Sequence, residues 1–298
     1  MQVLAGDIGG TKTLLAICDV SPPDVRTGAP SIEVLASSRY ESRSYSGVGA
    51  ICRAFASEVR RPMPRRAGFG VAGPVTNGRS HTTNLPWILD EEELAQALGI
   101  DSVRLVNDFH ALALGIPAVK AADLVTLNEG VRDPRGAWAV IGAGTGLGEA
   151  IATLGASGQR EVLASEGGHC SFAPRTGLEI GVLRFLMRRY DHVSWERVLS
   201  GDGLVNLADA ISHLALKTLA TGGVFVAGGI APKMLDFMKD GRFREAFVSK
   251  GRMRPVLEQM PVQIVLDARA GVLGAAALAA RESQLAPQTR NTPSTSPE

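Results

Sequence analysis

The chain has 298 residues, with 31 Lys or Arg and 30 Asp or Glu, so its formal net charge is +1. This balance excludes the broad basic surface of a nucleic-acid-binding or membrane-surface protein, and no uncharged apolar run is long enough to span a membrane. The length suits two lobes rather than one core. Three scattered cysteines favour free thiols in a reducing cytoplasm. Because Met1 leads directly into an apolar run, we expect no signal peptide.

The first half of the chain predicts strands that alternate with helices. Apolar runs flank a glycine-rich loop at 6–12, which predicts a strand–turn–strand unit. Helices are expected over 48–60, where apolar residues recur at spacing four, and over 91–98, just before a glycine. Further strands are expected at 32–37, 66–71 and 103–106.

The second half repeats this pattern loosely around a second glycine-rich loop at 142–148. One long helix is expected over 203–219, because its apolar residues alternate by three and four. The remaining strands are expected at 137–141, 147–154, 160–164, 223–227 and 262–266, and the remaining helices near 178–189 and at 271–281. The polar tail at 284–298 is expected to be disordered. This order of elements predicts an α/β fold with mixed sheets in two lobes.

The two glycine-rich loops predict a phosphate site. They read Gly6-Asp7-Ile8-Gly9-Gly10-Thr11-Lys12 and Gly142-Ala143-Gly144-Thr145-Gly146-Leu147-Gly148. Consecutive backbone amides in such turns form anion-binding concavities, and glycine lets a ligand approach the backbone closely. Neither loop is a Walker A motif, and neither leads into the helix that a dinucleotide loop requires. Tight hairpin turns without a ligand are the alternative interpretation.

Asp7 and a pair of threonines favour the phosphate interpretation. A carboxylate inside the first loop would repel bare phosphate, but it suits phosphate that carries Mg²⁺, bound directly or through water. Thr11 and Thr145 place hydroxyl donors at the same point of each loop. One loop in each half of the chain indicates one polyphosphate held between the two halves.

Asp108 is the candidate catalytic residue. It follows the expected strand at 103–106. Phosphoryl transfer to an alcohol needs a carboxylate that accepts the hydroxyl proton. The alternative is structural, because Asn107 and Asp108 are both residue types that cap the start of a helix.

Further polar side chains provide the groups that would bind a polyol. The set is Asn84, Asn107, Asp108, Glu166, His169 and Glu196. Amides, carboxylates and an imidazole can exchange hydrogen bonds with neighbouring hydroxyls. The two glycines between Glu166 and His169 predict a turn and disfavour a metal pair on a helix. A plain surface turn is the alternative for this segment, and a first-turn helix acid is the alternative for Glu196.

Taken together, these motifs resemble those of bacterial glucokinases, members of the hexokinase and actin-like ATPase superfamily. The matching stretches are GDIGGTK (6–12), GVAGPV (70–75), TNLPW (83–87), LVNDFHALALGI (105–116), GAGTGLG (142–148), EGGHCSFAP (166–174), ERVLSGDGLVNL (196–207) and GGVFVAGGIAPK (222–233). The resemblance implies the two-lobed actin-like ATPase (ribonuclease H-like) fold with a cleft between the lobes. It also implies ATP-dependent phosphorylation of glucose at its 6-hydroxyl, the first step of glycolysis.

The resemblance also implies roles for individual residues. Asp108 corresponds to the catalytic base. The sugar-binding positions are Asn107, Glu166, His169 and Glu196, with Asn84 in the sugar-side loop. The nucleotide positions are Gly6 to Lys12, then Gly142, Gly144, Thr145 and Gly146, and Gly228 and Gly229 near the adenosine. The implied ligands are glucose, ATP and Mg²⁺, the last at Asp7.

The implied organisation is a cytoplasmic enzyme that binds neither nucleic acid nor membrane and that allows a homodimer. A small lobe is expected at 1–117, completed by a C-terminal helix at about 268–283. A large lobe is expected at 118–267, followed by the tail at 284–298.

The chain departs from the family pattern in two places. Only fourteen residues (208–221) separate LVNL from GGVF, where typical members have several dozen more; we expect the single helix over 203–219 to replace them. The first loop carries Lys12-Thr13-Leu14 where many members have Asn, a small residue and Arg, so Lys12 could neutralise a phosphate or point to solvent. Three alternatives stay open: a kinase for another hexose or amino sugar, a sugar sensor, and a shortened homologue that binds sugar without turnover.

Overall fold

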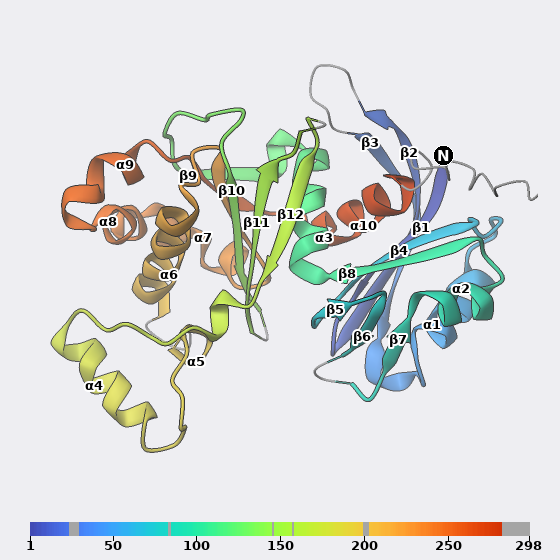
Figure 1. The fold of residues 1–298 in the computed structure, drawn as a ribbon, viewed down its shortest axis with the longest axis horizontal. Coiled ribbons are helices and arrows are strands. Elements are labelled where there is room, and N and C mark those ends of the chain that lie inside the picture. Colours follow the sequence, from blue (N-terminus) through green and yellow to red (C-terminus); the bar gives the residue numbers. More distant parts are fainter. Residues whose placement is uncertain (24–29, 83–84, 145, 157, 199–202, 282–298) are drawn as a thin grey trace, which may run out of the picture.

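The computed structural model describes residues 1–23, 30–82, 85–144, 146–156, 158–198 and 203–281. The predictions for Asn84, Thr145 and the tail at 284–298 lie outside these residues. Figure 1 shows two β-sheets side by side, with helices α3 (Asp108–Gly115) and α10 (Ala270–Arg281) between them. We call the half with the N-terminal sheet the small lobe and the other half the large lobe. None of the helices in the described ranges has both the length and the apolar character needed to cross a membrane.

The small-lobe sheet has five strands in the order β3-β2-β1-β4-β8. Their bounds are β1 (Gln2–Ile8), β2 (Lys12–Pro23), β3 (Pro30–Glu41), β4 (Arg66–Val71) and β8 (Ser102–Asn107). Strands β1, β2 and β3 pair antiparallel, whereas β1, β4 and β8 are parallel. The carboxyl ends of these three parallel strands therefore meet at one edge of the sheet.

Helices α1 (Val48–Glu58) and α2 (Glu91–Leu98) lie on one side of this sheet in Figure 1, and α10 lies on the other. Phe55 of α1 and Phe69 of β4 are fully buried between them. The α2 prediction is confirmed in its bounds, because the carboxylate of Asp90 caps its start and Gly99, with φ 65°, ends it. A small sheet of β5 (Val75–Thr76), β6 (Arg79–His81) and β7 (Ile88–Asp90) adjoins this lobe.

The large-lobe sheet repeats the same arrangement in the order β12-β11-β10-β13-β14-β9. Its strands are β9 (Leu124–Asn128), β10 (Trp138–Ala143), β11 (Leu147–Leu154), β12 (Arg160–Ser165), β13 (Gly223–Ala227) and β14 (Val262–Val265). An antiparallel hairpin, β10–β11, surrounds the second glycine-rich loop, and β10, β13 and β14 are parallel. The predicted mixed α/β fold with two mixed sheets is confirmed.

The helices of the large lobe include the predicted long helix. They are α4 (Gly177–Leu186), α5 (Trp195–Val198), α6 (Gly203–Thr218), α7 (Leu235–Lys239), α8 (Arg242–Val248) and α9 (Arg254–Glu258). Short 3₁₀ helices lie at Ser42–Ser44, Ile116–Ala118, Ala121–Asp123, Gly167–His169, Ala231–Met234 and Gly251–Met253. Helix α6 is continuous, so the sequence that joins LVNL to GGVF folds as one helix, as expected.

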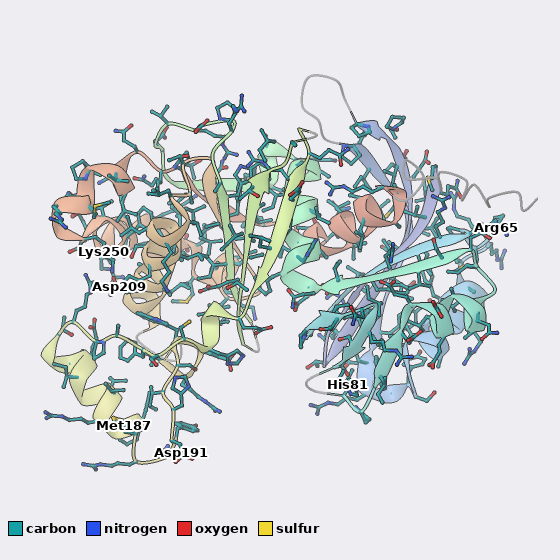
Figure 2. The ribbon with its side chains drawn as sticks, in the orientation of Figure 1. Arg65, His81, Met187, Asp191, Asp209 and Lys250 are labelled. Atoms are coloured by element: carbon teal, nitrogen blue, oxygen red, sulfur yellow. The ribbon has the colours of Figure 1, made fainter. Side chains whose placement is uncertain are left out.

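A buried charge network fixes α6 to its surroundings. The Asp209 carboxylate, 2% exposed, accepts hydrogen bonds from Arg175 (2.7 Å) and Lys250 (3.1 Å). Arg175 precedes α4 and Lys250 follows α8, and Figure 2 shows Asp209 and Lys250 in the outer part of the large lobe. Met187 and Asp191, labelled in the same figure, lie at the far tip of this lobe. The network therefore ties three segments together at a distance from the space between the sheets.

Helices α3 and α10 pack closely because glycines replace side chains where they meet. A Cβ atom at Gly115 would overlap the carbonyl oxygen of Ala270, and one at Gly274 would overlap the carbonyl oxygen of Ala111. Such close approach is available only to residues without a side chain. This contact fixes α3, and with it the residues at its N-terminus, against the small-lobe sheet.

Candidate active site

Asp7 and Asp108 lie at the same edge of the small-lobe sheet. Asp7 pairs with Gly70 of β4, and Gly70 pairs with Val106 of β8, two residues before Asp108. A Cβ atom at Gly70 would lie 2.7 Å from the Ala111 Cβ atom and 3.5 Å from the Asp108 Cα atom, so the glycine lets the start of α3 pack closely on β4. Two acids that are distant in sequence therefore flank the end of one central strand.

The environment of both carboxylates disfavours their charged forms. Burial raises the pKa of Asp108 to about 6, with a smaller contribution from the charge of Glu166. Burial also raises the pKa of Asp7 to about 6, and the charge of Asp108 adds to this shift. Each carboxylate is therefore more basic than an ordinary aspartate.

Asn107 caps helix α3. Its Oδ1 atom accepts hydrogen bonds from the backbone amides of Phe109 (2.9 Å) and His110 (3.3 Å), and its Nδ2 atom donates to the Gly73 carbonyl (3.3 Å). The carboxylate of Asp108 also accepts from the Phe109 amide at 2.9 Å. The helix-cap alternative raised from the sequence therefore describes what Asn107 does here, and the cap fixes the backbone of Asp108.

A serine that sequence reasoning missed holds the first glycine-rich loop. Ser42 is fully buried, and its hydroxyl donates to the Gly9 carbonyl at 2.7 Å and lies 3.0 Å from the Thr13 hydroxyl. Its backbone amide donates to the Thr11 carbonyl at 2.9 Å. The Lys12 side chain is exposed. Because Ser42 lies thirty residues beyond the loop and in no glycine-rich motif, the sequence carries no signal for this contact.

Glu196 lies under the second glycine-rich loop. Its Oε2 atom accepts a hydrogen bond from the Leu147 amide at 3.1 Å, and Gly146 lies directly against the same carboxylate. Gly228, with φ 84°, packs against the Ala143 carbonyl, so the segment predicted to lie near the adenosine is next to this loop. In this structure, Glu196 therefore hydrogen-bonds to the backbone of the second loop.

The second loop also contacts helix α3, which begins with the candidate base Asp108. A Cβ atom at Gly148 would overlap the Phe109 ring, and one at Gly142 would lie 3.1 Å from it. Phe109 directly follows Asp108 at the start of α3. The two glycines therefore let the large-lobe hairpin pack on the residue next to the candidate base.

A cavity of about 330 Å³ lies between the two lobes. Its lining residues are Pro74, Val75, Leu105, Val106, Asn107 and His110 of the small lobe, and Ser165 and Glu166 of the large lobe. Of the described residues predicted to bind a polyol, Asn107 and Glu166 thus share one cavity, whereas Asp108, His169 and Glu196 are not part of its lining. His169 remains beside it, with its Nε2 atom 3.8 Å from Glu166 Oε2. His110 was missed, although its neighbours in sequence were identified.

Comparisons with known proteins show the family of the chain. A family model described as Glucokinase matches residues 4–215 and 209–282. The glucokinase of Nostoc sp. (strain PCC 7120) is 35% identical over 345 aligned residues, which cover 94% of this chain and 99% of the relative. Since the alignment is longer than this chain, the relative has residues that are absent here. The two matched segments overlap at 209–215, inside α6. The residues that this chain lacks therefore belong between LVNL and GGVF, as the motif spacing predicted.

Solved structures share the fold. The crystal structure of glucokinase from an Antarctic psychrotroph is 30% identical, with a TM-score of 0.80, and the match covers 94% of this chain and 99% of that one. A ROK family glucokinase from Streptomyces griseus, solved with glucose and AMPPNP, has 22% identity and a TM-score of 0.58, over 94% of this chain and 100% of that one. These matches confirm the fold class that was predicted from the motifs. With a family model that spans nearly the whole described chain and a relative of this identity, the chain belongs to the glucokinase family.

Proposed function

We propose that this chain transfers the terminal phosphoryl group of ATP to the 6-hydroxyl of glucose, with Asp108 as the general base. The observation that carries this proposal is the position of the Asp108 carboxylate, beside Asp7 at one sheet edge and next to the cavity between the lobes. The basicity of Asp108 supports it, because a base works best when its pKa lies near the working pH.

In the proposed reaction, the oxygen of the 6-hydroxyl attacks the terminal phosphorus. Its proton passes to Asp108, the bond from that phosphorus to the bridging oxygen breaks, and ADP leaves. Phosphoryl transfer needs mainly positioning and charge stabilisation. The backbone amides of the two glycine-rich loops would supply the charge stabilisation, because they are fixed before the reaction begins. Ser42 and Glu196 support this role, since each hydrogen-bonds to one loop.

The hexose would lie between the lobes. Asn107 and Glu166 line the cavity there, and His169 and Glu196 would join them when the lobes close. The closing bodies we propose are 1–117 with 268–283, and 118–267. Closure would exclude water, which competes with the sugar as phosphoryl acceptor. The contact of α10 with β1, β2 and β4 supports assignment of the C-terminal helix to the small lobe.

We propose ATP as the donor and Mg²⁺ as its companion ion. The AMPPNP bound to the Streptomyces griseus relative supports ATP. No cluster of three or more metal-ligating side chains exists within the described ranges, which fits Mg²⁺ because this ion usually takes one or two carboxylates plus phosphate and water oxygens. Asp7 fits as that carboxylate, because a bound cation would offset the repulsion between the negative charges of Asp7 and Asp108. When bound, Mg²⁺ would neutralise charge on the phosphates.

We further propose a cytoplasmic homodimer. The free thiols Cys18, Cys52 and Cys170 support the compartment. Leu178 and Met187, which are 72% and 62% exposed at α4, support an interface on that helix. Light scattering on the purified protein measures the mass directly, and a monomer at micromolar concentration would remove the dimer from the proposal.

The variant Asp108→Asn tests the assignment of the base. The amide keeps the size of the side chain but cannot accept the proton, so we expect kcat to fall by about 10²–10⁴-fold while glucose affinity measured by calorimetry stays within a few-fold. A coupled assay with glucose and Mg·ATP gives the rate. Turnover close to that of the unaltered enzyme would refute the assignment.

A further inference from the structure

His110 stands on the wall of the cavity between the lobes. It is the third residue of α3, and it lines this cavity together with Asn107, Ser165 and Glu166. The rest of the lining is apolar. The imidazole is half-buried and makes no hydrogen bond to any residue in the described part of the chain. None of the described residues therefore uses the hydrogen-bonding capacity of this ring, which can pair with a ligand.

The other polar groups in the lining are already engaged to different degrees. The amide of Asn107 caps α3 through Oδ1 and donates to Gly73 through Nδ2. The Ser165 hydroxyl accepts a hydrogen bond from the Gly167 amide at 3.0 Å. Glu166 is largely exposed, with His169 nearby. His110 and Glu166 are therefore the groups of this cavity with the most capacity left for a ligand's hydroxyls.

The chemical state of His110 suits a hydroxyl. Burial, and to a smaller extent the charge of Arg281, lowers the pKa of the imidazole below its ordinary value. The ring is therefore neutral at neutral pH, with one N–H donor and one nitrogen acceptor. A sugar hydroxyl can both donate and accept, so either ring nitrogen can pair with it.

We propose that His110 is a specificity-determining residue that hydrogen-bonds to a ring hydroxyl of the hexose other than the 6-hydroxyl. This inference rests on the proposed function, because it takes the 6-hydroxyl to lie at Asp108. Asp108 is not part of the cavity lining among the described residues, so the hydroxyls that enter the cavity belong to the rest of the ring. A buried group that pairs with one hydroxyl rejects the analogue that lacks it.

The test compares the kinetics of His110→Phe and His110→Gln on glucose and on its 1-, 2-, 3- and 4-deoxy analogues. The phenyl ring fills the same space without a hydrogen bond, so we expect KM for glucose to rise roughly three- to tenfold while kcat stays within about twofold. For one deoxy analogue, kcat/KM should be lower than for glucose with the unaltered enzyme but about equal to that for glucose with His110→Phe. The amide of His110→Gln has a donor and an acceptor, and it should restore part of that discrimination.

The control is Val131→Phe, which adds the same ring at a position of the large lobe that is 70% exposed and should leave every ratio unchanged. If all four analogues keep the same penalty in His110→Phe as in the unaltered enzyme, His110 contacts no hydroxyl and the inference is wrong. Calorimetric binding of glucose without nucleotide separates the two proposals. Weaker binding by His110→Phe supports this one even if no phosphorylation occurs, whereas an inactive unaltered enzyme contradicts only the proposed function.

Discussion

The substitution Asp108→Asn should stabilise the protein even though it should lower kcat by orders of magnitude. The carboxylate lies where its charge is disfavoured, by burial and by neighbouring Glu166, and the same charge raises the pKa of Asp7. An amide of the same size can keep the hydrogen bond that Asp108 accepts from Phe109. The variant therefore removes an unfavourable charge and keeps the local geometry.

The size and pH dependence of this effect follow from the pKa. The pKa of Asp108 rises from 3.8 to about 6 on folding, so the native state binds this proton more tightly than the unfolded state. The resulting stability is fully present below pH 4 and is lost as the pH rises through 6. Two pKa units correspond to an upper limit of about 3 kcal/mol. Because Asp108 is only half-buried, we expect about 1–3 kcal/mol at pH 8 and about half of that at pH 5.

Thermal unfolding of the protein without ligands measures this difference. A gain of this size raises the unfolding midpoint by a few degrees in a chain of this length. The matched control is Asp191→Asn, at the exposed far tip of the large lobe (Figure 2), which should not change the midpoint. A variant Asp108→Asn that unfolds at the same or a lower temperature at pH 8, or whose gain does not depend on pH, would refute the account of a disfavoured charge.

Two further predictions concern the contacts that hold the glycine-rich loops. Ser42→Ala removes the hydroxyl that donates a hydrogen bond to the Gly9 carbonyl. This variant should lose about 1–3 kcal/mol of stability, and its KM for ATP should rise more than its KM for glucose. Equal changes in the two KM values would contradict a role at the phosphate loop. Gly148→Ala drives a methyl group into the Phe109 ring, so it should cost about 1–3 kcal/mol and lower kcat by displacing α3. The same substitution at Gly181, where a Cβ meets no atom within 4 Å, should do neither. Unfolding midpoints and steady-state rates of the two glycine variants decide this.

Helices and strands whose two ends are both marked by nearby residues could be predicted from the sequence. Helix α2 has an aspartate cap at its start and a glycine at its end, and β13 is a short apolar run between glycines. The strand β9 was missed, because its pairing partner among the described strands is β14, more than 130 residues later in the chain. Helices α7 to α9 are each seven residues or fewer. A segment of that length spans at most two helical turns, which is too short for a clear periodic pattern.

Some residues of the candidate site could also be predicted from nearby sequence, and others could not. Asp7 and Asp108 could be found because each stands at the end of a recognisable strand, in a segment rich in residues that form turns or caps. Ser42 and His110 could not, because their roles depend on what lies opposite them. Ser42 matters through the Gly9 carbonyl, and His110 through a cavity whose other wall comes from the large lobe. Sequence spacing carries no information on such contacts between distant segments.

The start of α3 explains how one short segment can serve several parts of the reaction. Successive residues of a helix point about 100° apart, so its first residues meet different surroundings. Asn107 caps the start of the helix, and Asp108 lies beside Asp7. Phe109 packs on the second glycine-rich loop, and His110 lines the cavity. Because the glycine contact with α10 fixes α3 in the small lobe, a movement of the large lobe would change the contacts that Phe109, Leu112 and Ala113 make with the large-lobe sheet. The Phe109 contact lies next to the candidate base, so we expect the proposed lobe closure to alter the surroundings of Asp108.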